Sequence, residues 1–267
     1  MLEGGSPSRG RRRPAFGSAA LAVAAACVSS AHAAPMDWTV EAGAAVRERP
    51  AHIGSTRYVT DGVPIFEATI GKDISISLDD GAKWRALHLG PVALGPIVEY
   101  RQSFSDDLPP GAFRMSDTVE VGGFSEWRTP IGIAEARLRR AANGYDGWSG
   151  DITFDTGGRV APKLLLGGEA RLSWADSNFT QEYFGLQPHG RGHFGLPHFQ
   201  DEDFVTVGAE LDAARDLTAR TRVILELSAD HIVSELRPSP LFSTRDIFTA
   251  TLGLTYRWSA RSTGRQP

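Results

Sequence analysis

Residues 246–258 read DIFTATLGLTYRW, and this stretch decides the fold of the chain. Every second residue is apolar or aromatic: Phe248, Ala250, Leu252, Leu254, Tyr256 and Trp258. The residues between them are mostly threonine, glycine and arginine. Because side chains alternate between the faces of a strand, this segment is predicted to be a strand with one apolar and one polar face. A last strand ending in an aromatic residue, in a chain that opens with an export signal, indicates a bacterial outer-membrane β-barrel.

The N-terminus has the three parts of an export signal. Four arginines within residues 9–13 precede an Ala-rich apolar stretch over 15–30, and Ala31-His32-Ala33 is a cleavage site of the A-x-A type. We therefore predict that residues 1–33 are removed as a signal peptide. Twin-arginine transport and lipidation at Cys27 are alternatives, but each lacks the rest of its motif. Cys27 is the only cysteine, so a mature chain without it has no disulfide and no thiolate metal site.

The composition excludes several classes of protein. Loss of the signal removes four of the 28 basic and one of the 32 acidic residues, which leaves a net charge of −7. This balance argues against a nucleic-acid-binding protein, and the three lysines of the chain predict no polybasic membrane-surface patch. No mature stretch has eighteen continuous apolar residues, so spanning helices are not expected. A closed barrel is the other structure that pairs every backbone group within a bilayer.

The alternation of apolar and polar residues predicts twelve antiparallel strands in one domain, a barrel over 34–258 that is followed by a short periplasmic tail, 259–267. The strands are expected near 38–48, 63–70, 73–79, 84–89, 91–104, 117–127, 132–141, 147–156, 160–175, 203–215, 220–233 and 246–258. Long connections, expected outside the cell, mostly alternate with short periplasmic turns, as in outer-membrane barrels. The long ones are 49–62, 105–116, 176–202 and 234–245; one of the short ones is Gly157-Gly158. The alternative is a secreted soluble all-β domain. Aromatic residues near strand ends favour the barrel: Trp38, Trp127, Trp174, Tyr256 and Trp258.

The polar faces of these strands would line the barrel interior with charges of both signs. The residues that we expect to face the lumen most clearly are Glu169, Arg171, Glu210, Asp212, Arg222, Glu226 and Arg257. Twelve strands enclose less space than the 16–18 strands of an open porin. Two interpretations remain open: a salt-bridged plug that stabilises the barrel, and a small selective pore.

No constellation of catalytic or metal-binding residues stands out. His189, His193 and His198 lie in one long loop, but their spacing matches no structural zinc motif. Asp230 and His231 are adjacent in a predicted strand, so their side chains point to opposite faces and cannot act together. We therefore predict no catalytic residue, cofactor or metal site, and no enzymatic activity.

The order of several segments resembles the MltA-interacting protein (MipA/OmpV) family. The most specific part is SWADSNFTQEYFGL at 173–186, followed by FGLPHF at 194–199 and DFVTVGA at 203–209. Further matching segments are RPAHIGSTRY at 49–58, PIF at 64–66, VEVGGFSEW at 119–127, GYDG at 144–147 and LGLTYRW at 252–258. The resemblance implies an outer-membrane barrel in contact with lipid.

The resemblance also implies a function, that of a scaffold joining a murein-degrading lytic transglycosylase to a murein-synthesising enzyme in the periplasm. A narrow solute pore in osmotic response and a surface adhesin or receptor are the alternatives. Two features depart from the family pattern: the tail 259–267 continues past the terminal aromatic residue, and the loop segment 189–193 is unusual.

Overall fold

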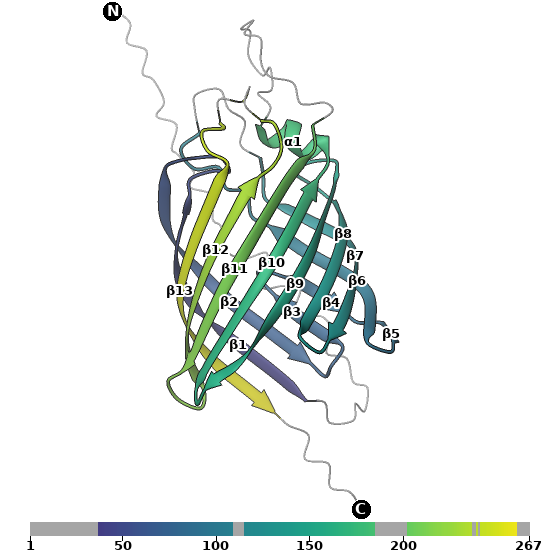
Figure 1. Cartoon of the computed structure of the whole chain (residues 1–267), viewed down its shortest axis with the longest axis vertical. Coiled ribbons are helices and arrows are strands. Elements are labelled where there is room, and N and C mark those ends of the chain that lie inside the picture. The colour runs from purple at the N-terminus through teal and green to yellow at the C-terminus, as the bar shows by residue number, and fades with distance from the viewer. Residues whose placement is uncertain (1–36, 109–114, 185–201, 237–238, 240, 261–267) are drawn as a thin grey trace, which may run out of the picture.

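The computed structural model describes residues 37–108, 115–184, 202–236, 239 and 241–260. They form one antiparallel β-barrel of tilted strands (Figure 1). The strands are β1 Trp38–Pro50, β2 Tyr58–Ile70, β3 Ile74–Ser77, β4 Gly81–Trp84, β5 Leu87–Leu89, β6 Val92–Arg101, β7 Thr118–Thr129, β8 Gly132–Ala141, β9 Trp148–Ala161, β10 Leu164–Ala175, β11 Phe204–Asp216, β12 Thr221–Ile232 and β13 Asp246–Ala260. One helix, α1 Ser177–Phe184, follows β10. No helix in the described part of the chain is long and apolar enough to span a membrane.

The barrel closes in two places that differ greatly in extent. The last strand, β13, pairs with β1 along eleven residue pairs, from Trp38↔Ala260 to Glu48↔Ala250. The other closure lies between β4 and β6 and has two pairs, Ala82↔Val98 and Lys83↔Ile97. Because β4 and β5 both pair with β6 and are separated by two residues, they occupy one strand position. The barrel therefore has twelve strand positions, as predicted.

The terminal strand has the two faces that its sequence predicts. Phe248, Leu252 and Leu254 are exposed on the outer surface, where Phe248 is 55% accessible. Thr251 and Thr255, which alternate with them, are buried on the inner face. The same arrangement continues around the barrel, for example at Leu211, which is 65% exposed. Large apolar side chains on the outside are unfavourable in water, and they fit a wall that lies in lipid.

The structure corrects several predicted boundaries. The predicted strand 84–89 is divided between β4, Gly81–Trp84, and β5, Leu87–Leu89. The predicted turn at Gly157-Gly158 is wrong, because β9 continues through both glycines to Ala161. A Cβ at Gly157 would lie 2.7 Å from the carbonyl oxygen of Leu166, so this glycine allows close strand pairing rather than a turn. The predicted loop 49–62 is half strand, because β1 and β2 pair as far as Pro50↔Tyr58 and only residues 51–57 connect them. The last strand also runs two residues past Trp258.

The predicted long loop 176–202 begins with a helix that the sequence analysis missed. The carboxylate of Asp176 caps α1 by accepting hydrogen bonds from the backbone N–H groups of Asn178 and Phe179, at 3.2 and 3.3 Å. The helix buries Phe179, Tyr183 and Phe184 against the ends of neighbouring strands. A helix of eight residues is too short for a clear periodic pattern. The remainder of that loop and the signal segment 1–33 lie outside the described residues, and the signal peptide stays a prediction.

Candidate functional site in the lumen

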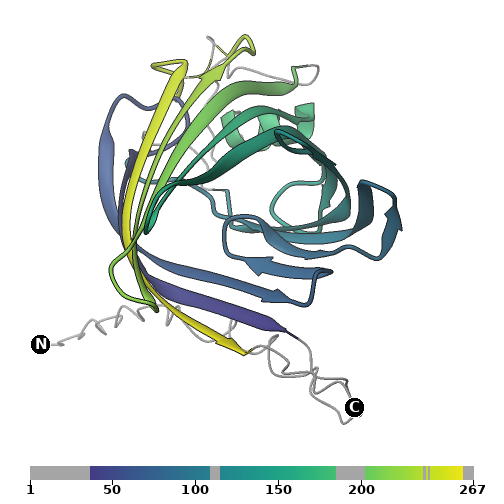
Figure 2. The same ribbon diagram turned by 60° about the horizontal axis from the view of Figure 1, so that its bottom comes forward.

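The strands enclose two neighbouring cavities, and Figure 2 looks toward the interior from the end where the short turns lie. The larger one, the lumen cavity, has a volume of about 730 Å³ and is lined by side chains from strands all around the barrel. The smaller one, the mouth cavity, has a volume of about 630 Å³ and lies where β1 begins and β13 ends. Glu67 borders both cavities. Since short turns mark the periplasmic end of such barrels, the mouth cavity opens toward the periplasm.

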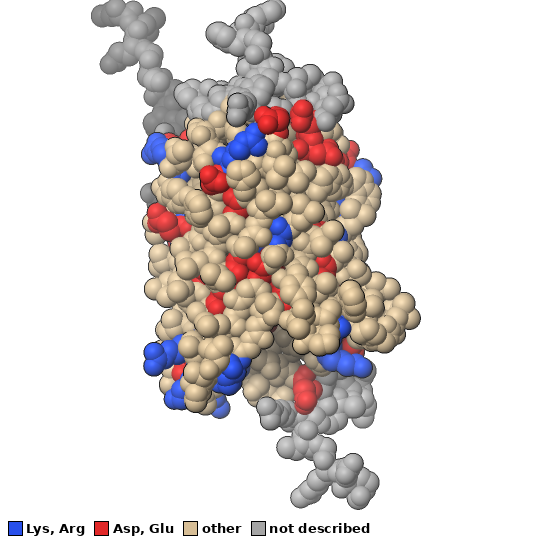
Figure 3. All heavy atoms as spheres, in the orientation of Figure 1, with Lys and Arg blue, Asp and Glu red and all other residues tan. Residues whose placement is uncertain are grey.

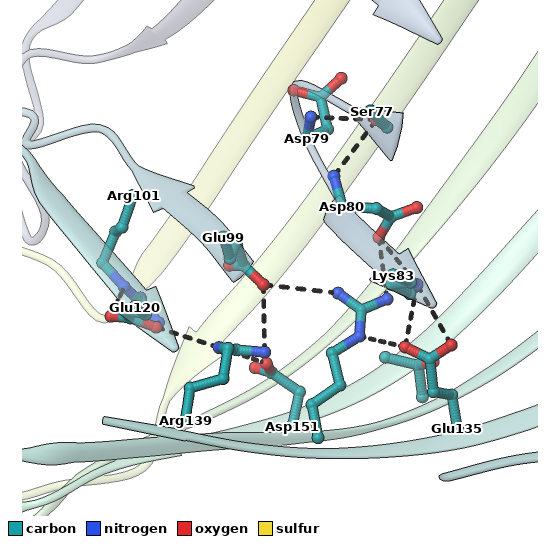
Figure 4. A network of polar contacts seen from close by, with 12 residues as sticks. Ser77, Asp79, Asp80, Lys83, Glu99, Arg101, Glu120, Glu135, Arg139 and Asp151 are labelled. Carbon is teal, nitrogen blue, oxygen red and sulfur yellow. Dashed lines mark hydrogen bonds and ion pairs between the residues drawn. The ribbon is translucent and has the colours of Figure 1, made fainter. Parts of the chain in front are cut away.

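A short hairpin brings two carboxylates into the lumen cavity. Strands β3 and β4 have four residues each, so the hairpin extends only about 13 Å and ends at Leu78, Asp79 and Asp80. The hydroxyl of Ser77 accepts hydrogen bonds from the N–H groups of Asp79 and Asp80, which fixes the tip (Figure 4). Asp80 accepts a hydrogen bond of 2.8 Å from Arg137 of β8. The tip thus contacts the wall at β8.

One wall of the lumen is a closed network of ion pairs. Arg139 of β8, whose side chain is 1% exposed, contacts Glu99 at 3.1 Å, Glu120 at 3.0 Å and Asp151 (Figure 4). Glu120 also accepts hydrogen bonds from Arg101, from Tyr145 Oη at 2.6 Å and from Ser149 Oγ at 2.7 Å. Buried charges tolerate loss of water only when they are paired in this way.

The neighbouring wall carries an excess of carboxylates. In the register of the sheet, Glu169 of β10 lies beside Asp155 of β9 on one side and Glu210 of β11 on the other. Asp212 of β11 lies beside Glu226 of β12. Like charges on directly opposite residues repel each other. This acidic wall therefore favours water or a cation in the cavity.

In the lumen cavity every basic residue has an ion-pair partner, but several acidic residues have none. Seven basic residues line the lumen cavity: Arg47, Lys83, Arg85, Arg101, Arg137, Arg139 and Arg171. Each has a carboxylate within 4.0 Å. Ten acidic residues line the same cavity, and within the described ranges six of them have no ion pair. These six are Glu67, Asp79, Asp155, Glu210, Asp212 and Glu226. The groups of the lumen cavity that have no ion-pair partner are thus all carboxyl groups, and they form the candidate functional site.

The residues expected to face the lumen divide between the two cavities. Glu169, Arg171, Glu210, Asp212 and Glu226 line the lumen cavity, whereas Arg222 and Arg257 line the mouth cavity.

In the mouth cavity, Arg257 contacts Glu41 at 2.7 Å and Arg222 contacts Asp216 at 2.9 Å. The sequence analysis did not single out Glu67 or Asp79. The turn signal Asp79-Asp80-Gly81 in the sequence could have identified Asp79 as the tip of a hairpin.

Aromatic residues form a buried cluster at the outer end of the described barrel. Phe179 stacks on Tyr183 with ring centroids 5.6 Å apart and meets the edge of Tyr145 at 5.1 Å. Phe184 and Phe204 complete this cluster, which we call the aromatic cap. The hydroxyl of Tyr183 accepts a hydrogen bond from Ile53 N and donates one to Phe104 O, which ties two outer loops to α1. Burial raises the pKa of Tyr183 and of Tyr145, so both hydroxyls stay protonated.

The described chain offers no arrangement of side chains suited to catalysis by a metal. No group of three or more His, Cys, Asp or Glu side chains in the described ranges has metal-binding geometry. His189, His193 and His198 lie outside those ranges. His231 bonds to Asp246 at 2.7 Å on the outer surface, whereas Asp230 pairs with Arg171 inside.

A closed antiparallel barrel with an apolar outer surface and a charged lumen defines an outer-membrane β-barrel protein. Residues 42–258 match the family described as MltA-interacting protein MipA. The chain belongs to this family, which confirms the resemblance found in the sequence. A search of curated proteins found no match.

A search of solved structures found matches at low sequence identity. Neisserial surface protein A is 9% identical, with 82% of this chain and 95% of that chain covered and a TM-score of 0.28. A porin is 8% identical, with 84% and 100% covered and a TM-score of 0.34. The attachment invasion locus protein Ail of Yersinia pestis is 10% identical, with 84% and 99% covered and a TM-score of 0.22.

Proposed function

We propose that this outer-membrane barrel is a non-enzymatic scaffold that binds murein-degrading and murein-synthesising enzymes at its periplasmic end. The observation that carries the proposal is membership, over residues 42–258, of a family named for its interaction with MltA. The geometry supports this direction, because the aromatic cap covers the outer end of the described barrel and the mouth cavity opens toward the periplasm.

The periplasmic turns supply a charged surface for such partners. Six exposed basic residues lie there, which we call the basic rim: Lys72, Arg128, Arg159, Lys163, Arg215 and Arg220. Among the described residues, Asp37 is the one exposed acidic residue at this end, whereas Asp73 and Asp216 are half-buried. In Figure 3 most charged side chains at the lower end of the visible face are Lys or Arg. Single-sign surfaces of this kind steer partners of opposite charge.

The sequence did not predict this patch, because its members come from four separate turns. In the sequence the four turns lie far apart, and each carries only one or two charges near its tip. A count of lysines or a search for runs of charge therefore does not detect the patch. The barrel brings the turns into one ring. The rim therefore enlarges the periplasmic contact surface that short turns alone would offer.

Binding of purified MltA to the purified barrel tests the proposal. The variant Arg215→Glu/Arg220→Glu reverses two charges of the basic rim. The matched control Arg57→Glu/Arg140→Glu reverses two exposed charges at the outer end. We expect the rim variant to weaken binding about tenfold at 0.1 M salt, where the Debye length is about 10 Å, and the control to leave it unchanged. Equal affinity of both variants, or no binding by the native barrel, would contradict the proposal.

A second candidate function is a small cation-selective pore, and the six free carboxylates of the lumen favour it. The aromatic cap argues against steady conduction, because it covers the outer end. Single-channel recording in planar bilayers separates the two functions. Conductance steps with a preference for cations would support the pore, and their absence from well-folded protein would remove it.

A further inference from the structure

The barrel wall is incomplete between β2 and β6. Strand β3 pairs with residues 67–70 of β2, and β4 pairs with residues 97 and 98 of β6. No strand of the described chain pairs with residues 58–66 of β2 on the side away from β1, nor with residues 99–101 of β6 on the side away from β7. We call this region the lateral gap.

The hydrogen bonds of β2 show which backbone groups face the lateral gap. Gly71 N donates to Asp37 O on the β1 side, whereas Phe66 O accepts from Leu78 N on the β3 side. Because the two sides alternate along an antiparallel strand, the backbone groups of Thr60, Gly62 and Pro64 point into the gap. Proline has no N–H to leave unpaired, so Pro64 occupies a position suited to a free edge.

The lateral gap lies at membrane depth. Tyr58 and Tyr100, on β2 and β6, are exposed on the outer surface near the outer ends of these strands, where interfacial aromatic residues lie. Unpaired backbone groups facing hydrocarbon cost several kcal/mol each. Water or a polar ligand from the lumen must therefore reach this edge.

Ion pairs and a β-bridge limit the lateral gap at its outer end. Arg47 donates to Asp61 at 2.9 Å and to Gln102 at 3.0 Å, joining β1 and β2 to the chain after β6. His52 and Ser105 form a bridge farther out. At its lower end the gap is bounded by the hairpin tip. The region without strand pairing is thus bounded on four sides and does not run along the whole barrel.

The two sides of the opening differ in polarity. On the outer surface, Leu78 at the hairpin tip is 40% exposed and Val98 of β6 is 44% exposed. Inside, the lumen cavity reaches the same place, and Glu67 and Asp79 line it there without an ion pair to the described residues. A molecule in the opening meets lipid and apolar side chains outside, and free carboxylates inside.

We propose that the lateral gap admits a cationic amphiphile from the outer membrane into the lumen. Its positively charged head binds Asp79 and Glu67, and its apolar tail stays against Leu78, Val98 and lipid. The sign of the charge follows from the lumen, where every lining base is paired and the free groups are carboxylates. An anionic head gains nothing from this site. The inference is independent of the scaffold function, which uses the periplasmic rim.

Uptake of a fluorescent alkylammonium probe with a twelve-carbon chain, measured on the barrel in lipid vesicles, tests the proposal. Gly62→Trp places a large side chain at the edge of the gap, where a Cβ meets no atom within 4 Å. Gly158→Trp is the matched control, because its Cβ also meets no atom within 4 Å and it lies on β9, away from the gap. Asp79→Asn removes one carboxylate of the site, with Asp155→Asn, an unpaired carboxylate elsewhere in the cavity, as its control.

We expect Gly62→Trp to slow uptake at least fivefold and Asp79→Asn to weaken binding about tenfold, with smaller effects of both controls. The alkyl sulfate of equal length should not compete. Uptake that Gly62→Trp does not slow, together with equal binding of a short-chain ammonium ion, would place entry at the periplasmic mouth and overturn the proposal. Competition by the alkyl sulfate, or equal effects of the two carboxylate variants, would also overturn it. Circular dichroism verifies that each variant is folded.

Discussion

Replacement of Arg139 by methionine tests how far the ion-pair network of the lumen stabilises the barrel. The side chain is 1% exposed and contacts three carboxylates. After its loss, Glu120 keeps Arg101 and two hydroxyl donors, and Glu99 keeps Arg137 at 3.8 Å. Asp151 loses its ion pair. Breaking a buried pair costs about 3–5 kcal/mol, and because one carboxylate is left uncompensated we expect about 3 kcal/mol.

Urea unfolding of the barrel in lipid vesicles, followed by tryptophan fluorescence, measures this loss. The control Arg171→Met removes a guanidinium that is 25% exposed, so water replaces part of the lost interaction and the cost should be smaller by about 1 kcal/mol or more. The triple variant Arg139→Met/Glu120→Gln/Asp151→Asn removes the orphaned charges and should recover stability. A loss below about 1 kcal/mol for Arg139→Met, or a triple variant less stable than the single one, would refute the reasoning.

Three further changes test other parts of the structure by the same unfolding measurement. Phe179→Ala empties the centre of the aromatic cap and should cost about 3–5 kcal/mol, and the same variant should admit small solutes from the outer side in a vesicle-swelling assay. Gly157→Val forces a Cβ to within 2.7 Å of a carbonyl oxygen and should cost about 1–3 kcal/mol, whereas Gly158→Val should change stability by less than about 0.5 kcal/mol. Asp176→Ala removes the cap of α1 and should cost about 1 kcal/mol; no change would show that packing alone fixes the helix.

The architecture was predictable because its main signal is local. A strand half in lipid must alternate its side chains, and the sequence alternates from Phe248 to Trp258 in β13 and from Glu169 to Trp174 in β10. The short elements were harder. Strands β3, β4 and β5 have three or four residues each, too few for a period to emerge, and α1 has fewer than three turns.

The charge pattern of the lumen was predictable only in part. Alternation indicates that Glu169 and Glu210 face inward, but the register of β10 against β11 decides that they lie side by side. Arg139 likewise contacts Glu120 and Asp151 because of the register of β8 against β7 and β9. The sequence of one strand alone does not predict these contacts. The lateral gap depends on how far the hairpin ending at Asp79 extends between β2 and β6, which is a property of the closed barrel.

The scaffold function is tested most directly by crosslinking the full-length protein in intact cells, capturing it and identifying the proteins that come with it. The account predicts enrichment of a lytic transglycosylase and a murein synthase over an unrelated outer-membrane barrel, and loss of that enrichment in Arg215→Glu/Arg220→Glu. Absence of both enzymes, with the protein folded and located in the outer membrane, would contradict the account.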